Sequence, residues 1–161
     1  MRVQVSPCPQ NIMRDFFIKT FWFFVNPTME FYWFIFRPKT RGVKCIIQWK
    51  DKILFVRLNY SHKGWTVPGG GVSREESFEE AVRREMSEEV DITLGEVKMF
   101  REYVTTKQYK IDTVQCFWSK VENPYFKIDN LEIAEAKWSL ITDIPEPHRP
   151  GLIEFLSYLK T

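Results

Sequence analysis

Three glutamates near the middle of the chain have the residue type and the spacing of a metal-binding group. Glu85, Glu88 and Glu89 stand at positions i, i+3 and i+4, which places their side chains on one face of a helix. Like charges at this spacing repel by roughly a few tenths of a kcal/mol per pair, so a purely structural role does not favour them. A divalent cation reverses that repulsion, because Mg²⁺ binds hard oxygen ligands from carboxylates, water and phosphate.

A glycine loop and a helix start precede these glutamates. Residues 68–71 read Pro-Gly-Gly-Gly, and the missing Cβ atoms would let backbone approach the carboxylates closely. Ser77, with Glu80 three residues later as its capping-box partner, predicts a helix over Phe78–Val90. The sequence thus predicts a glycine loop beside an acidic helix face.

The same face also fits an ordinary solvated helix surface. Glu79 and Arg83, like Glu80 and Arg84, have the i,i+4 spacing of surface ion pairs. For a glutamate triplet alone this is the more common situation. The glycine loop and the upstream Glu76 favour the metal site instead.

The stretch from Gly70 to Ile92 resembles the box of the Nudix family. That pattern is Gly, five residues, Glu, seven residues, Arg-Glu-apolar-any-Glu-Glu, any, Gly and an apolar residue. The sequence matches it at Gly70, Glu76, Arg84, Glu85, Met86, Glu88, Glu89 and Ile92. Each charged residue type makes up about 6% of an average protein, so this agreement is very improbable by chance. One position departs, since Asp91 stands where the pattern has glycine; Asp tolerates a left-handed helix cap at some cost.

The resemblance implies an α+β fold, an αβα sandwich with a mixed β-sheet, and a hydrolase acting on nucleoside diphosphate derivatives. Glu85, Glu88 and Glu89 would bind one or more Mg²⁺ or Mn²⁺ ions, helped by Glu76 or a backbone carbonyl near Gly70. The metal would neutralise the diphosphate, polarise phosphorus and lower the pKa of the water that attacks in line. The implied partner is a small nucleotide derivative, and the implied enzyme is a pyrophosphohydrolase.

The resemblance also suggests roles for residues that flank the metal-binding face. Arg84 resembles the box arginine that orients a neighbouring glutamate through a charge-assisted hydrogen bond. The general base stays open among Glu88, Glu89 and Glu132. Glu132 lies six residues before Trp138, where relatives often add a carboxylate to the metal cluster, although a solvated loop glutamate fits equally well.

Two further residues are weak candidates for substrate contact. Arg57 lies at the end of a predicted strand and Tyr60 follows that strand, and both could reach a phosphate or a base. Structural roles at the strand end and in the hairpin fit them at least as well.

The elements that must position these residues follow from hydrophobic periodicity and turn residues. Alternating or continuous apolar runs predict strands, and the last apolar stretch predicts a closing helix. The predicted strands are Val43–Trp49, Ile53–Leu58, Trp65–Val67, Val97–Thr105, Ile111–Val121 and Ala136–Leu140, and the closing helix is Leu152–Leu159. Strands on both sides of one central helix, with a second helix at the end, predict an α+β domain whose mixed sheet is covered on both faces.

The first residues form a separate region in this interpretation. We expect a tail and an aromatic helical extension over 1–39, with two short helices from Met13 to Phe36, and the hydrolase domain over 40–161. The aromatic surface of these helices must be covered by the rest of the domain, by a second subunit in a homodimer or by a membrane interface. Packing against the rest of the domain is favoured. The longest fully apolar run there, Phe31–Phe36, is far below the ~20 residues of a membrane span.

The composition narrows the partners and the compartment. A formal charge of +2 from 23 basic and 21 acidic residues gives no basic footprint for duplex nucleic acid. The three cysteines, Cys8, Cys45 and Cys116, are odd in number and lack a CxxC pair, which fits a reducing, cytoplasmic environment. Two rival functions stay open, a catalytically silent nucleotide sensor and a module that docks to a membrane or partner through its aromatic N-terminus.

Overall fold

A five-stranded β-sheet forms the centre of the fold. The structure, a computed structural model, describes residues 20, 38–59, 64–106 and 110–158. Within them the strands are β1 (Lys39–Trp49), β2 (Lys52–Leu58), β3 (Lys98–Thr105), β4 (Ile111–Lys120) and β5 (Ile133–Leu140), and helices α2 (Phe78–Val90) and α3 (Leu152–Ser157) accompany them. Five of the six predicted strands and the box helix are present, and β1 and β5 begin earlier than the sequence predicted. The predicted strand Trp65–Val67 is wrong, because Trp65 and Thr66 form only isolated bridges, to His148 and Val56.

The strand order makes the sheet mixed, as predicted. The order is β3-β4-β1-β2-β5, and β1 and β2 form an antiparallel hairpin around Lys50 and Asp51. β1 and β4 pair in parallel, with Val43 opposite Gln115, whereas β2–β5 and β3–β4 are antiparallel. The apolar β1 therefore lies in the middle of the sheet, and the more polar β3 and β5 form its edges.

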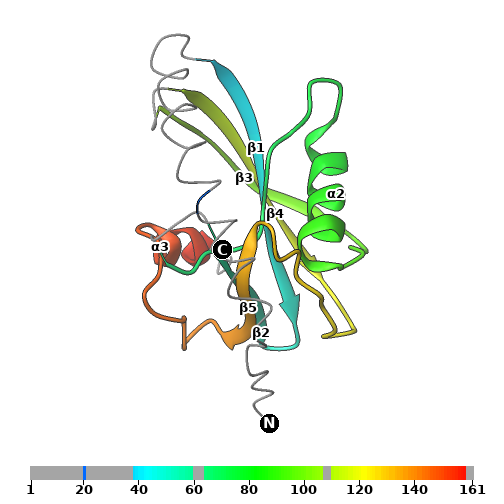
Figure 1. The fold of residues 1–161 in the computed structure, drawn as a ribbon, viewed down its shortest axis with the longest axis vertical. Helices are drawn as coiled ribbons and strands as arrows, with labels where there is room; N and C mark the ends of the chain where they lie inside the picture. The colour runs from blue at the N-terminus through cyan, green and yellow to red at the C-terminus, as the bar shows by residue number, and fades with distance from the viewer. Residues whose placement is uncertain (1–19, 21–37, 60–63, 107–109, 159–161) are drawn as a thin grey trace.

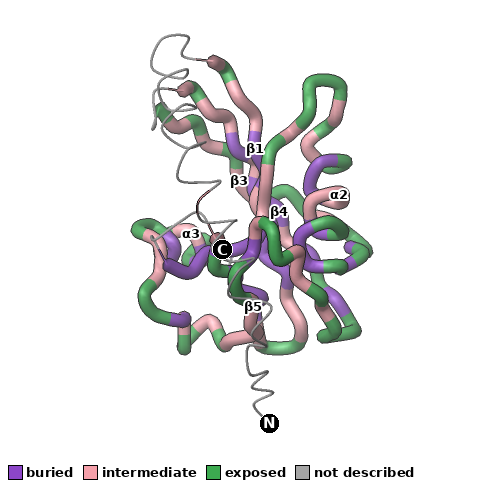
Figure 2. The backbone as a smooth tube through the Cα atoms, viewed as in Figure 1, coloured by how far each residue is buried: buried purple, intermediate pink, exposed green. Residues whose placement is uncertain are grey.

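The two faces of the sheet carry separate hydrophobic clusters. Figure 1 shows α2 on one side of the sheet and α3 on the other. Neighbouring residues of β1 divide between the faces: Cys45 and Ile47 belong to the cluster under α2, whereas Ile46 belongs to the cluster under α3. Burial along the central strands and on the inner side of α2 follows this layering (Figure 2). The arrangement is the predicted αβα sandwich.

Both ends of α2 are fixed by specific caps. The Ser77 side chain accepts a hydrogen bond from the backbone N–H of Glu80, and the Glu80 carboxylate accepts one from the Ser77 N–H, which completes the predicted capping box. At the other end Asp91 adopts the left-handed conformation, with φ 57° and ψ 38°. The residue that departs from the box pattern thus keeps the backbone geometry that glycine would give.

Several expectations fall on residues outside the described ones. These are the two N-terminal helices, the aromatic extension of which they are part, Cys8 and Tyr60. Cys45 and Cys116 are free buried thiols, as expected. Among the described residues, no helix has the length and apolar character required to cross a membrane.

Candidate functional site

The glycine loop lies directly on β1. The Val43 N–H donates to the Gly70 carbonyl at 2.9 Å, and the Cys45 N–H donates to the Pro68 carbonyl at 3.0 Å. A Cβ atom on Gly69 would overlap the backbone of Val43 and Lys44, so only glycine allows this close approach. The sheet therefore fixes the loop that faces the glutamates of α2.

Glu85 fills the space above Gly70. Its carboxylate lies where a Cβ on Gly70 would be, and its side chain is 13% exposed. Burial raises the pKa of Glu85, while the adjacent Arg84 opposes that rise. The missing side chain at Gly70 thus makes room for a partly desolvated carboxylate.

Glu89 is the most buried carboxylate of the box. It is 4% exposed and accepts a hydrogen bond from the Gly69 N–H at 3.2 Å. Burial, followed by the charge of Glu85, raises the pKa of Glu89 to about 8, and the nearby Glu132 and Asp129 act in the same direction. A divalent cation at this point would favour the ionised form and relieve the repulsion.

Arg84 connects the loop, the helix and three glutamates. Its guanidinium binds Glu76 with two hydrogen bonds of 2.8 and 3.0 Å, and it also donates to Glu85, to Glu88 and to the Gly71 carbonyl. The Arg84 bonds to Glu76, with a further bond from the Ser73 N–H, lower the pKa of Glu76 to about 2. The arginine holds the acidic face in place by charge-assisted hydrogen bonds.

This network corrects one of the ion pairs expected from spacing. Glu79 and Arg83 do form their i,i+4 pair, at 2.9 Å. The Glu80–Arg84 pair that the spacing also allowed does not form, because the Ser77 cap engages the Glu80 carboxylate and Arg84 donates to Glu76 instead. Competition between a capping box and an ion pair is not visible in residue spacing alone.

The three glutamates of the predicted metal site do not point the same way. Glu85 and Glu89 face the glycine loop, whereas Glu88 is 62% exposed and bonded to Arg84. Within the residues that the structure describes, no three His, Cys, Asp or Glu side chains converge as a ready-made metal site. To join the other two, Glu88 would have to exchange its bond to Arg84 for one to the cation.

The donor set nevertheless fits a hard divalent cation. Glu85 and Glu89 offer carboxylate oxygens beside one backbone loop, and the Gly70 carbonyl, which already accepts from Val43, keeps a second lone pair. A half-buried cluster of like charges gains most from a dication. The chemistry of these residues therefore suits Mg²⁺ or Mn²⁺.

Glu132 lies close to this cluster, and Arg57 does not join it. Burial, Asp129 and Glu88 raise the pKa of Glu132, in that order, so its carboxylate interacts electrostatically with the box. Arg57 instead forms a 2.9 Å ion pair with Glu135 between β2 and β5, with both side chains about half exposed. Arg57 thus takes part in a structural ion pair, and its contact with a substrate stays a prediction.

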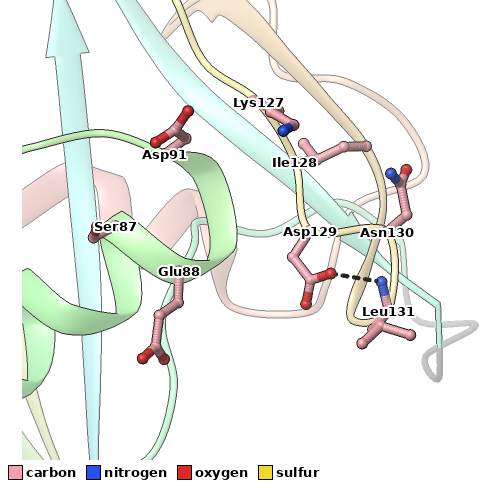
Figure 3. Close-up of a pocket in the computed structure, with 8 residues that line it drawn as sticks. All are labelled: Ser87, Glu88, Asp91, Lys127, Ile128, Asp129, Asn130 and Leu131. Atoms are coloured by element: carbon pink, nitrogen blue, oxygen red, sulfur yellow. Dashed lines mark hydrogen bonds between the residues drawn. The ribbon is translucent and has the colours of Figure 1, made fainter.

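Segment 127–131 is a part of the site region that the sequence analysis did not single out. The Lys127 N–H donates to the Val90 carbonyl at 3.0 Å, and the Asp129 N–H donates to the Glu89 carbonyl at 2.8 Å, so the segment docks on the C-terminal end of α2. A pocket of about 460 Å³ lies between them (Figure 3). Its only sequence signal was a polar stretch before β5, which is typical of any loop.

A mixed sheet between helices, with a glycine loop beside an acidic helix, is the arrangement that the box resemblance predicted. A comparison with protein families identifies the class. The family model described as NUDIX domain matches residues 38–159. The chain therefore belongs to the NUDIX domain family, as the box resemblance predicted. No curated protein matches the chain in a sequence search.

Solved structures with the same fold include proteins from bacteria and an animal. The MutT NUDIX hydrolase from Burkholderia pseudomallei has a TM-score of 0.67 at 19% identity, covering 75% of this chain and 98% of its own. The NUDIX domain of Shewanella oneidensis NrtR, complexed with ADP ribose, has a TM-score of 0.67 at 15% identity, covering 78% and 89%. An Ap4A hydrolase from C. elegans has a TM-score of 0.59 at 22% identity, covering 75% and 98%. At these identities the likeness shows the shared fold alone.

Proposed function

We propose that the chain is a metal-dependent hydrolase that cleaves the diphosphate linkage of a nucleoside diphosphate derivative. In this reaction water adds across the P–O–P bridge, one P–O bond breaks, and two phosphate-bearing products leave. The observation that carries the proposal is the desolvated pair Glu85 and Glu89 against the glycine loop. Nucleotide chemistry is supported by similar structures that are described with ADP ribose or as an Ap4A hydrolase.

The proposal assigns distinct tasks to the residues of the box. Glu85, Glu88 and Glu89, with the Gly70 carbonyl, would hold Mg²⁺ or Mn²⁺. When bound, the metal supplies charge neutralisation of the diphosphate and an acidified water. Arg84 positions the carboxylates of Glu85 and Glu88 through its hydrogen bonds.

The proton of the attacking water requires a base near these carboxylates. Glu88, Glu89 and Glu132 are the candidates. Glu132 is the one we favour, because the proposal already assigns Glu88 and Glu89 to the cation, which makes their carboxylates less basic, whereas burial and nearby carboxylates raise the pKa of Glu132. Glu88 and Glu89 would then serve as ligands alone.

The test compares Glu89→Gln with Glu79→Gln on the same helix. Glu79 is exposed and pairs only with Arg83 among the contacts described, so it is a matched control for removing one negative charge. Product release from ADP-ribose, a nucleoside triphosphate and a dinucleoside polyphosphate is measured with Mg²⁺, with Mn²⁺ and with a chelator. We expect activity to require metal and to fall at least ~100-fold in Glu89→Gln, since even outer-shell changes cost 10–100-fold.

Three results would contradict the proposal. Activity that persists with chelator, or that Glu89→Gln retains, would remove the metal-based mechanism. Nucleotide binding without turnover of any compound would identify a nucleotide sensor instead.

A further inference from the structure

The pocket beside the box has a lining that is unsuited to phosphate. Three carboxylates, those of Glu88, Asp91 and Asp129, line it together with one ammonium group, that of Lys127. The proposed function assigns Glu88 to the cation, so the charges left in the lining are those of Asp91 and Asp129 against that of Lys127, a formal total of −1. An additional phosphate group placed there would meet net repulsion, whereas a neutral group with hydroxyls would meet hydrogen-bond acceptors.

The pocket is continuous with the predicted metal-binding face. Glu88 belongs to both, because it shares one helix face with Glu85 and Glu89 and also lines the pocket. Figure 3 shows that Glu88, Asp129 and Leu131 turn to the same side, away from the side to which Asp91 points. A substrate whose diphosphate lies over the box would therefore extend one of its two ends towards Asp129 and Leu131.

Asp129 and Leu131 provide complementary surfaces for a sugar. One Asp129 oxygen accepts the Leu131 N–H at 3.0 Å, and the other has no hydrogen-bond partner among the described residues, which leaves it for a hydroxyl donor. Leu131 is 61% exposed and offers an apolar contact for the carbon face of a sugar ring. None of the eight residues lining the pocket is aromatic, so a base would lack the stacking partner that bases favour.

The wall that carries these two residues is built in advance. Besides its two backbone bonds to the end of α2, the segment is held by Asn59, the residue after β2, whose side-chain amide donates to the carbonyls of Asn130 and Leu131 at 2.8 and 3.2 Å. The Ile133 N–H also donates to the Asp129 carbonyl at 2.9 Å. Because these bonds already hold the segment in place, little conformational entropy is lost when a ligand binds, and its contacts contribute directly to affinity.

We propose that this pocket binds the uncharged, hydroxyl-bearing sugar on the far side of the diphosphate from the nucleoside. The enzyme then prefers nucleoside diphosphate sugars, of which ADP-ribose is the simple test case, over nucleoside triphosphates. The inference rests on the proposed diphosphate hydrolysis and specifies its substrate class.

Asp129→Asn is the discriminating variant. Asparagine keeps an oxygen that accepts the Leu131 N–H, replaces the second acceptor with an amide donor and removes one negative charge. ADP-ribose and ATP are compared because they share the ADP portion and differ in the group attached to the β-phosphate, a ribose or a third phosphate. We expect the ratio of kcat/KM values, ADP-ribose over ATP, to fall by about tenfold or more, the effect of one hydrogen bond to a charged group.

The control and the readouts separate this role from a structural one. Asp143→Asn changes an exposed carboxylate on the turn after β5 and should leave the ratio as in the unmodified chain. Nucleotide products are measured with Mg²⁺ or Mn²⁺, and the inhibition constant of ATP replaces its kcat/KM if ATP is not cut. Thermal unfolding of both variants checks that the chain remains folded.

Each other outcome overturns the inference. Equal losses with both substrates would show that Asp129 holds the metal or the shared ADP portion, and an unchanged ratio would show that the pocket does not select the distal group. If the unmodified chain cuts neither compound with either metal, the proposed function fails and this inference fails with it. Turnover by the unmodified chain, measured first, therefore distinguishes the two failures.

Discussion

At Gly70 the space for a metal ligand depends on one missing methyl group. A Cβ there would overlap the Glu85 carboxylate, whereas a Cβ on the next residue, Gly71, would meet nothing within 4 Å. Neither glycine is among the residues with positive φ, so backbone strain does not distinguish them. Alanine substitutions at Gly70 and at Gly71 can therefore be compared to test whether the space beside Glu85 matters.

We expect Gly70→Ala to displace Glu85 and to lower activity by roughly 10–100-fold, a range typical of disturbed metal ligation. The Glu85 side chain is flexible at its end, so the fold should survive and the thermal midpoint should change little. Gly71→Ala serves as the control and should behave as the unmodified chain. Turnover and thermal unfolding of both variants give the answer, and equal activity of the two would show that Glu85 need not lie against Gly70.

The box residues could be predicted from the sequence because their pattern is local. Spacing on one helix, with a loop seven to ten residues upstream of its first residue, fixes which side chains share a face, whatever the rest of the fold does. The partner of Arg84 could not be predicted in this way. It depends on the Ser77 cap engaging Glu80, which leaves the guanidinium for Glu76, and that choice is made by three-dimensional geometry.

Among the elements, α2 ends in a residue whose backbone conformation lowers the stability of the chain. Asp91 has a φ of 57°, and a left-handed conformation costs L-residues other than glycine roughly 1–2 kcal/mol, somewhat less for Asp. Asp91→Gly should therefore stabilise the chain by up to about 1 kcal/mol, which for this size raises the thermal midpoint by roughly 2–4 °C.

Lys50 supplies the comparison for this prediction. It also has positive φ, 54°, in the β1–β2 turn, so Lys50→Gly should give a gain of similar size. Urea unfolding of both variants measures the difference in free energy. A loss of stability in Asp91→Gly alone would mean that the Asp91 side chain contributes more than its conformation costs.

The elements themselves differ in how well the sequence predicts them. β1, β2 and β4 carry strong apolar patterns, and their approximate bounds follow from these. β5 begins at Ile133, three residues before the predicted start, because it is an edge strand with exposed residues such as Glu135 that mask the pattern. The parallel pairing of β1 with β4 brings together residues far apart in the chain, such as Thr40 and Asp112, and no local signal specifies it.

At the scale of the whole molecule, the buried carboxylates make stability depend on pH and on metal. The pKa of Glu89 is raised from 4.5 to about 8, so between these values the folded chain binds a proton that the unfolded chain has released. Its contribution to stability is fully present below about pH 4.5 and is lost as the pH rises through about 8. Glu76 has the opposite sign: its pKa is lowered from 4.5 to about 2, so its contribution is lost as the pH falls through that window.

We therefore expect the thermal midpoint of the metal-free chain to fall between pH 5 and pH 8.5 more steeply than that of Glu89→Gln, which has no carboxyl to ionise at that position. Because a dication favours the ionised carboxylate, Mg²⁺ should raise the midpoint of the unmodified chain more at pH 8.5 than at pH 5.5, and should have a smaller effect on Glu89→Gln. Scanning calorimetry with and without Mg²⁺ measures both slopes. Parallel slopes for the two proteins in the absence of metal would show that Glu89 is already ionised in the folded chain, and the electrostatic argument for a cation beside it would then lose its basis.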